Sequence, residues 1–289
     1  MTSLLNILSI LLITEFVGGN VANGFIVLVN CIDLLKRHKL SAVDWILMAL
    51  VLSRTGLLWI ILMNWYAKVR IFAHFVWITT HHFSTWLATC LSIFYLLKIA
   101  NFSSFLFLYL KWRVKSVILT ILLGSLVFLV SYLAVVKRVM TNKVNMTWNF
   151  KSWGFPQVWN MSAFTLGSFI SLVMSLISFV LLTFSMWKHL RKMQCSGNGA
   201  QNSSYKVHIR ALQTVFSYIL PLTAYILALM ISVWNSNSLS NKPVILFCQT
   251  LGVLYPSIHS VFLIWGNKKL KEAFLWFLWQ LMCWLRERE

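Results

Sequence analysis

The sequence predicts an all-α membrane protein: a seven-transmembrane helix bundle followed by a C-terminal amphipathic membrane-surface helix. Three observations lead to this prediction. Of the 289 residues, 59% are hydrophobic and only 11% are charged, whereas a soluble domain carries about 25% charged residues. The mean hydropathy is +0.77. The apolar residues fall into long runs, and Lys and Arg gather in the short connections between them, so nearly all of the chain is expected to span a bilayer.

Seven apolar runs can be counted, and each is about as long as the roughly 20 residues that cross a bilayer as a helix. Their approximate ranges are 7–32, 42–65, 75–99, 117–136, 159–187, 209–234 and 244–265. We number them one to seven in this order. The third run carries a stripe of polar and small residues on one helical face, and a membrane helix turns such a stripe toward its neighbours.

The stretch 267–285 differs from the seven runs. Apolar residues recur at helical spacing behind Lys268, Lys269 and Lys271, which is typical of a helix that lies along the membrane surface. An eighth span is the alternative. We therefore expect a membrane bundle over 1–266 and a cytoplasmic amphipathic helix and tail over 267–289.

The distribution of Lys and Arg predicts the orientation. The connections after runs one, three and five, together with the tail, hold most of the 25 cations, and cytoplasmic connections are the ones enriched in Lys and Arg. The N-terminus is thus expected to be extracellular and the C-terminus cytoplasmic, in a multi-pass protein of the plasma membrane. Because the cations are dispersed over short connections, the formal charge of +19 does not indicate nucleic-acid binding. No Lys or Arg precedes the first run, so we expect no cleaved signal peptide.

The sequence predicts one glycosylation site and no metal site. Asn145, in an Asn-Met-Thr sequence of the expected outer connection between runs four and five, is the predicted glycosylation site. The five cysteines show no CxxC spacing, and we expect neither a metal site nor a cofactor. No carboxylate pair or nucleophile–base spacing indicates an enzyme.

Arg54 lies in the middle of the second run. A charge at that depth costs about 3 kcal/mol unless polar partners accompany it. Glu15 and Asn23 of the first run, and His259 and Ser260 of the seventh, are the candidate partners. We therefore predict a polar hub that joins runs one, two and seven. It either rearranges between two states or acts as a static hydrogen-bonded connection.

Candidate ligand contacts lie in the outer half of the expected bundle. Trp77 and His81 share the polar stripe of run three, whereas the adjacent His82 points about 100° away and is expected to pack against a neighbouring helix. Tyr225 in run six and Gln249 in run seven are predicted to face the same pocket.

Pro221 interrupts run six, with Tyr218 and Tyr225 on either side of it along one face. Proline removes one backbone hydrogen bond and kinks a helix. It is the predicted hinge for opening the inner side, and a kink without motion is the equal alternative.

Several motifs together resemble one family, the type 2 bitter taste receptors, which are seven-span G-protein-coupled receptors. They occur in the same order over nearly the whole chain. They are Glu15, Gly19-Asn20 and Asn23-Gly-Phe; Leu52-Ser53-Arg54; His82-Phe-Ser-Thr-Trp-Leu-Ala-Thr; Phe94-Tyr-Leu-Leu-Lys; Phe107-Leu-Tyr-Leu-Lys-Trp-Arg; Phe184-Ser-Met-Trp-Lys-His-Leu-Arg; His208-Ile-Arg-Ala-Leu-Gln-Thr; Tyr255-Pro-Ser-Ile-His-Ser; and Gly266-Asn-Lys-Lys-Leu-Lys.

The resemblance implies a receptor for bitter small molecules that signals through a gustducin-type heterotrimeric G protein to phospholipase C and calcium. By motif alignment, Trp77 matches the family's pocket tryptophan, and His81 stands where many members have Asn. Besides agonist and G protein, membrane lipid and a second receptor in an oligomer are the expected partners. The G-protein contacts predicted at the inner end are Tyr95, Lys98, Lys111, Arg113, Lys188 and Arg191. Attraction of these cations to anionic lipid is an alternative that is compatible with G-protein contact.

Two other functions stay open on the sequence alone. A seven-span channel or transporter would conduct ions without a G protein, although no acidic pathway is evident in the runs. A divergent receptor that no longer signals is the other alternative, because the connection between runs two and three is shorter than the family pattern.

Overall fold

The computed structural model describes residues 2–36, 41–63, 70–100, 102–144, 155–194, 202–234 and 242–286. Within these ranges the chain forms nine helices. They are α1 (Thr2–Leu35), α2 (Ala42–Met63), α3 (Arg70–Ile99), α4 (Phe105–Trp112), α5 (Val114–Val144), α6 (Phe155–Gln194), α7 (Asn202–Trp234), α8 (Lys242–Gly266) and α9 (Lys268–Arg286).

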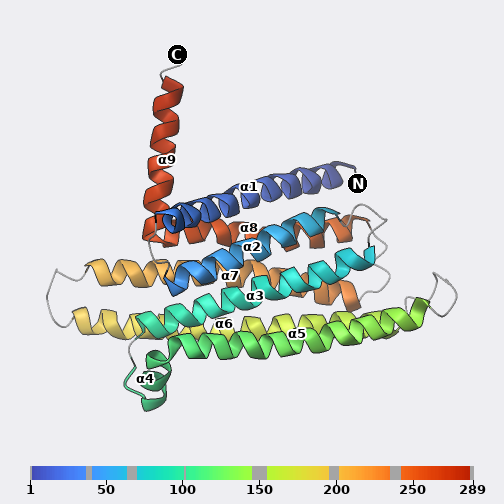
Figure 1. Cartoon of the computed structure of the whole chain (residues 1–289), viewed down its shortest axis with the longest axis horizontal. Coiled ribbons are helices and arrows are strands. Elements are labelled where there is room, and N and C mark those ends of the chain that lie inside the picture. Colours follow the sequence, from blue (N-terminus) through green and yellow to red (C-terminus); the bar gives the residue numbers. More distant parts are fainter. Residues whose placement is uncertain are drawn as a thin grey trace.

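Seven of these helices correspond to the seven predicted spans. Helices α1, α2, α3, α5, α6, α7 and α8 run side by side along one axis, as Figure 1 shows, while α4 and α9 do not follow that axis. Five of the seven contain described stretches of 20 to 30 residues that are long and apolar enough to cross a membrane. The described apolar stretches of α7 and α8 are Leu212–Ala228 and Thr250–Gly266. The predicted all-α, seven-span fold class is confirmed.

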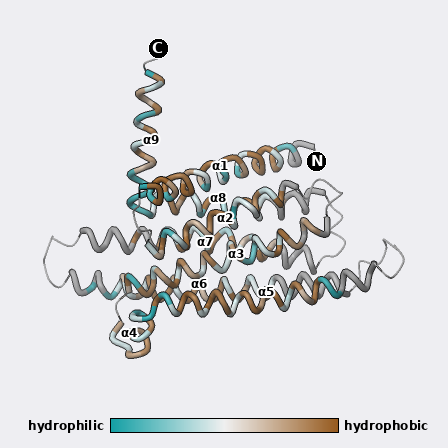
Figure 2. The backbone as a smooth tube through the Cα atoms, in the orientation of Figure 1, coloured by the Kyte–Doolittle hydropathy of each residue, from teal (hydrophilic) through white to brown (hydrophobic). Residues whose placement is uncertain are grey.

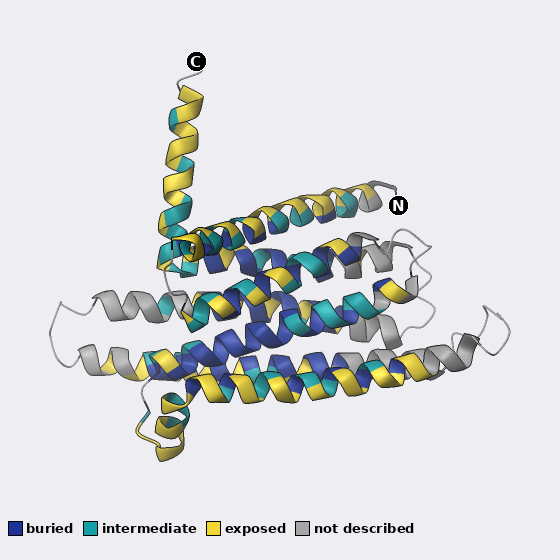
Figure 3. Ribbon diagram, in the orientation of Figure 1, coloured by how far each residue is buried: buried dark blue, intermediate teal, exposed yellow. Residues whose placement is uncertain are grey.

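Helix α3 lies at the centre of the bundle. In its apolar stretch 78% of the residues are buried, compared with 22% in α5 and 28% in α1. In Figure 3 most of α3 accordingly has the dark blue of buried residues. The outward faces of α1 and α5 are apolar instead, as the brown segments of Figure 2 show. Exposed Leu28 and Val127 are examples. Such faces suit contact with lipid, and the polar stripe of the third run points inward as predicted.

A glycine lets α1 approach α8 closely. A methyl group added at Gly19 would overlap the hydroxyl of Ser257 and come within 3.1 Å of Leu58. Small residues at such crossings allow membrane helices to pack backbone to backbone. This packing helps to hold α1 against the two helices that carry the rest of the polar hub.

Helix α9 turns across the bundle axis and projects from it (Figure 1). The side chain of Asn267 accepts hydrogen bonds from the backbone N–H groups of Lys269 (3.0 Å) and Leu270 (3.4 Å), which satisfies donors at the start of the helix. Leu270 is buried, and the Phe274 ring packs edge-on against Phe25 of α1 at 5.5 Å between centroids. The eighth-span alternative is therefore wrong, and the amphipathic surface helix is confirmed.

Lys269 connects α9 to two other helices. Its ammonium group lies 2.5 Å from a carboxylate oxygen of Asp33 in α1 and 3.6 Å from one of Asp44 in α2. It also donates a hydrogen bond to Asn30 Oδ1 at 2.8 Å. We call these four side chains the Lys269 cluster. It fixes the first turn of α9 against the ends of α1 and α2.

The short helix α4 was not predicted. It contains only eight residues, and Ser104 at its start makes no side-chain capping bond. Lys111 in this helix donates to the backbone carbonyl of Ala100 at 3.0 Å, which satisfies an acceptor at the C-terminal end of α3. Helix α4 lies at the same end of the bundle as α9 (Figure 1).

Candidate functional site

Four aromatic rings from three helices meet in the interior. His81 of α3 lies 5.8 Å from the Trp77 ring on the same helix, 5.7 Å from Tyr225 of α7 and 5.8 Å from Tyr255 of α8, measured between centroids. Tyr225 and Tyr255 stack at 5.6 Å with an interplanar angle of 23°. We call Trp77, His81, Tyr225 and Tyr255 the aromatic cluster.

The cluster brings together three of the four predicted ligand contacts. His81 is buried at its centre, with 1% of its surface exposed, and Trp77 is half-buried. A Cβ at Gly252 would come within 3.2 Å of the Tyr225 ring, so glycine at this position lets the ring lie against α8. The fourth contact, Gln249, belongs to α8, and its side chain lies outside the described residues.

Sequence reasoning assigned no role to Tyr255. It is one helical turn from His259 and belongs to the motif that ends at Ser260, and that spacing is the signal that could have identified it. Its ring stacks on that of Tyr225 and lies 5.8 Å from that of His81. Tyr255 therefore belongs to the aromatic cluster and lies next to the polar hub.

The predicted polar hub is present around Arg54. The guanidinium is completely buried. Its Nη1 donates to Ser260 Oγ at 3.1 Å, and its Nη2 donates to Nδ1 of His259. Because a guanidinium can only donate, Nδ1 of His259 is the accepting nitrogen. Ser260 Oγ in turn lies 2.6 Å from Asn23 Oδ1 on α1, so side chains from α1, α2 and α8 form one hydrogen-bonded group.

Glu15 occupies a different position from the one predicted. Its backbone carbonyl accepts a hydrogen bond from Ser257 at 3.1 Å, and its Oε2 atom is buried without a hydrogen-bond partner among the described residues. No ion pair joins it to Arg54 in the described part of the chain. The expectation that the Glu15 side chain completes the hub is wrong, because Glu15 lies about two turns from Asn23 along α1. Arg54 is held by neutral groups instead.

The hub continues across the bundle through Tyr218 of α7. The Tyr218 ring lies 5.3 Å from that of His259, and its hydroxyl donates to the backbone carbonyl of Thr85 on α3 at 3.0 Å. One turn along α3, the Thr89 hydroxyl lies 2.7 Å from Ser171 Oγ and 3.0 Å from Ser175 Oγ, both on α6. A chain of polar contacts thus crosses the bundle from α1 to α6.

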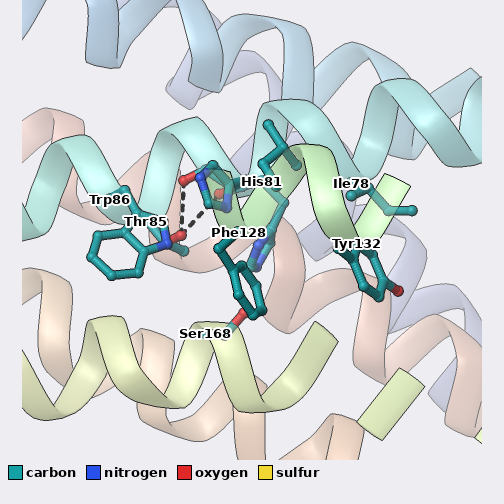
Figure 4. A pocket seen from close by; sticks show the side chains of 10 residues that line it. Ile78, His81, Thr85, Trp86, Phe128, Tyr132 and Ser168 are labelled. Atoms are coloured by element: carbon teal, nitrogen blue, oxygen red, sulfur yellow. Dashed lines mark hydrogen bonds between the residues drawn. The ribbon is translucent and has the colours of Figure 1, made fainter. Parts of the chain in front are cut away.

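A small cavity lies beside the aromatic cluster, between α3, α5 and α6. Figure 4 shows Ile78, His81, Thr85 and Trp86 of α3 facing Phe128 and Tyr132 of α5 and Ser168 of α6. The space open to the centre of a water-sized molecule is about 20 Å³, which is room for about one water. Among the described residues, no group of three His, Cys, Asp or Glu side chains could hold a metal ion.

Pro221 is buried within α7, which continues as an α-helix on both sides of it. It lies between Tyr218 of the hub and Tyr225 of the aromatic cluster, both of which are buried. Pro256 in α8 is a second proline in a corresponding place, between Tyr255 and His259. A hinge role for Pro221 stays a prediction.

The predicted G-protein contacts lie toward one end of the bundle. Tyr95 and Lys98 are in the last turns of α3, where Lys98 is exposed, and Lys111 and Arg113 belong to α4 and its C-terminal cap. On α6, Lys188 and Arg191 are exposed. The Arg191 guanidinium lies 4.0 Å from the centroid of the Trp187 ring. The role of these residues stays a prediction, as does glycosylation of Asn145, which lies outside the described residues.

Comparison with known proteins identifies similar chains along the full length. A family model described as "Taste receptor protein (TAS2R)" matches residues 1–282. The chain is 50% identical to human "Taste receptor type 2 member 43" and 50% identical to human "Taste receptor type 2 member 46". Each alignment covers 97% of this chain and 96% of the relative. The chimpanzee protein named "Taste receptor type 2 member 43" is also 50% identical, with the same coverage.

Proposed function

Because this chain belongs to the taste receptor protein (TAS2R) family, we propose that it binds a bitter small molecule at the aromatic cluster and relays binding to a gustducin-type G protein. Membership makes the chain a multi-pass, seven-span bitter taste receptor that couples to G proteins and is not an enzyme. The family resemblance predicted from the sequence motifs is confirmed. The location of the agonist and the identity of the G protein are our proposal.

The observation that supports the agonist site is the convergence of α3, α7 and α8 on His81. Ligand pockets are mostly apolar and aromatic, with a few polar groups that orient the ligand, and the aromatic cluster has this composition. An agonist that inserts between His81 and Tyr225 contacts the helices whose relative positions it has to change. We expect Gln249 of α8 to contribute to the same site.

The polar hub supports a route from this site toward the inner end. The Tyr218 ring lies 5.3 Å from that of His259, which accepts from Arg54, and Tyr255 of the aromatic cluster is one helical turn from His259 on α8. An agonist that moves α7 against α8 therefore changes the distance between Tyr218 and His259, with Pro221 as the hinge. A ligand shifts such an equilibrium only by its differential affinity for the two states, and a few kcal/mol suffice for a large shift.

The inner end is where we place the G protein. Separation of α6 from α7 would uncover the cations of α4 and α6, and the activated G protein would stimulate phospholipase C and release calcium. In this proposal the N-terminus lies outside the cell and α9 lies at the cytoplasmic face of the plasma membrane. This orientation agrees with the distribution of Lys and Arg. Anionic lipid is a second partner of the same cations.

The test is heterologous expression of the full chain with a G protein carrying the gustducin C-terminus, a calcium readout and a panel of bitter compounds. For an active compound, His81→Ala and Tyr225→Ala are expected to raise the half-maximal concentration at least about tenfold, which corresponds to about 1.4 kcal/mol. Thr79→Ala is the matched control, because its hydroxyl bonds within α3 to the Phe75 carbonyl.

Surface expression of each variant is measured alongside the calcium response. Equal concentration dependence in all three variants would place the agonist elsewhere and overturn the proposed site. A response that persists without any G protein would favour a channel, and a silent receptor at normal surface levels would favour a divergent chain that no longer signals.

A further inference from the structure

The cavity between α3, α5 and α6 lies beside the aromatic cluster but faces different helices. Its neighbouring helices are α5 and α6, whereas those of the aromatic cluster are α7 and α8. His81 belongs to the aromatic cluster and also lines the cavity, whereas His82 lines the cavity and takes no part in the cluster. The rest of the wall combines apolar side chains, such as Trp86 and Leu129, with the hydroxyl-bearing residues Thr85, Tyr132 and Ser168. The cavity therefore offers both apolar and polar contacts.

His82 contributes a buried ring nitrogen to the wall of this cavity. The side chain is 93% buried, since 7% of its surface is exposed. Among the described residues, its Nε2 atom has no hydrogen-bond partner. In a neutral imidazole this nitrogen either donates or accepts, depending on the tautomer. A hydroxyl group can do both, so a hydroxyl can satisfy Nε2 in either tautomer.

Phe128 separates the cavity from the lipid side. This half-buried ring lies against Gly167 of α6, where a Cβ would approach it to 2.6 Å. The adjacent residues Val127 on α5 and Leu166 on α6 are exposed, at 69% and 58%. Figure 4 shows Phe128 reaching from α5 toward Ser168. A rotation of one aromatic side chain would therefore open the cavity between α5 and α6.

We propose that this cavity is a second binding site, which takes the hydroxyl of a lipophilic alcohol or phenol arriving from the bilayer between α5 and α6. The hydroxyl forms a hydrogen bond with Nε2 of His82, and the hydrocarbon part lies against Trp86 and Leu129. The cavity has room for about one water, so the ligand hydroxyl fits this space and the rest of the molecule displaces Phe128. Such a ligand satisfies the buried ring nitrogen and needs no charge.

The test measures binding directly and does not depend on the proposed agonist site or on signalling. The full-length receptor is purified in lipid nanodiscs and irradiated with octanol that carries a diazirine at carbon 3, and adducts are mapped by peptide mass spectrometry. We expect adducts on the segments of α3, α5 and α6 around the cavity. Excess unlabelled octanol should remove them.

Three variants distinguish the site from general partitioning into lipid. His82→Phe keeps a ring but removes the ring nitrogens, and it should lower labelling of the cavity at least about fivefold. Phe128→Ala removes the cover and should raise labelling at least about twofold. Phe169→Ala is the matched control, because Phe169 on α6 is 45% exposed and does not line the cavity. Its labelling should equal that of the unmodified receptor.

The outcomes separate cleanly. Adducts that octanol does not compete away, that spread over the lipid-facing helices, or that are as frequent in His82→Phe as in the parent would overturn the proposal. If His82→Phe does not yield folded receptor, the comparison of Phe128→Ala with Phe169→Ala decides. Equal labelling of those two variants would also overturn the second site.

Discussion

Ser260→Ala is the substitution that probes the polar hub most directly. The Ser260 hydroxyl accepts from Arg54 and lies 2.6 Å from Asn23 Oδ1. Alanine removes this one oxygen and leaves the helix and its volume almost unchanged. The buried guanidinium loses one of its two described acceptors, and the Asn23 oxygen and the Pro256 carbonyl lose the single hydroxyl hydrogen that lies within reach of both. The Arg54 and Asn23 side chains are fully buried, so water cannot replace the lost contacts without rearrangement.

The expected decrease in the free energy of unfolding follows from these lost contacts. A hydrogen bond to a charged group contributes about 1.5–3 kcal/mol, and a buried acceptor left without a donor costs about 1–3 kcal/mol. Since the two losses share one hydroxyl, we expect a total of about 3–5 kcal/mol. At about 2–3 °C per kcal/mol for a domain of this size, the thermal midpoint should fall by about 6–15 °C.

The assay is thermal unfolding of the purified full-length receptor at one scan rate, because membrane receptors often unfold irreversibly. Ser178→Ala is the matched control, since that buried hydroxyl donates to Met174 on its own helix. Asn23→Ala and the double variant with Ser260→Ala complete a cycle that should be strongly non-additive. A midpoint for Ser260→Ala within about 1 °C of Ser178→Ala, or simple additivity in the cycle, would refute the hub as a source of stability.

Three further substitutions test other contacts. Gly19→Ala should destabilise the receptor by about 1–3 kcal/mol, because the new methyl group overlaps the α8 serine that it faces. Gly18→Ala, with open space at that position, should be neutral in the same thermal assay. Tyr218→Phe removes the bond from α7 to the α3 backbone and should cost about 1 kcal/mol. In the Tyr218→Phe variant, basal calcium signalling should also rise. An unchanged thermal midpoint together with unchanged basal signalling in this variant would contradict a signalling role for the contact between α7 and α3. Lys269→Ala should loosen α9 from α1 and α2 while costing only about 1 kcal/mol, as measured by the mobility of a spin label placed on α9. Lys268→Ala, which loses only an exposed pair within α9, should leave that mobility unchanged.

The spans and the hub could be predicted because each shows a signal within one segment of the sequence. A run of apolar residues indicates a span by itself, and a charge such as Arg54 inside a run demands partners wherever they lie. His259 and Ser260 were then identifiable as polar residues in another run. Glu15 was mistaken for a member of the hub because helical phase places it on the correct face but says nothing about depth.

The remaining contacts depend on the register between helices, which the sequence does not reveal. The bond from Tyr218 to Thr85 joins a side chain to a backbone carbonyl 133 residues away, and any residue has such a carbonyl. The Lys269 cluster likewise requires that the first turn of α9 meet the ends of α1 and α2. Helix α4 was missed because eight residues without a side-chain cap carry little helical signal of their own.

The separation of Arg54 from its acceptors has a consequence for how the chain is made. Ser260 lies 206 residues further along, so at about 5–20 residues per second the ribosome needs roughly 10–40 s to reach it. During that interval the second span resides in the translocon or bilayer with a positive charge and no acceptor from α8. A nascent receptor that ends before α8 keeps that charge unsatisfied for good. Completion of α8 is therefore the step that supplies both of the acceptors described for this arginine.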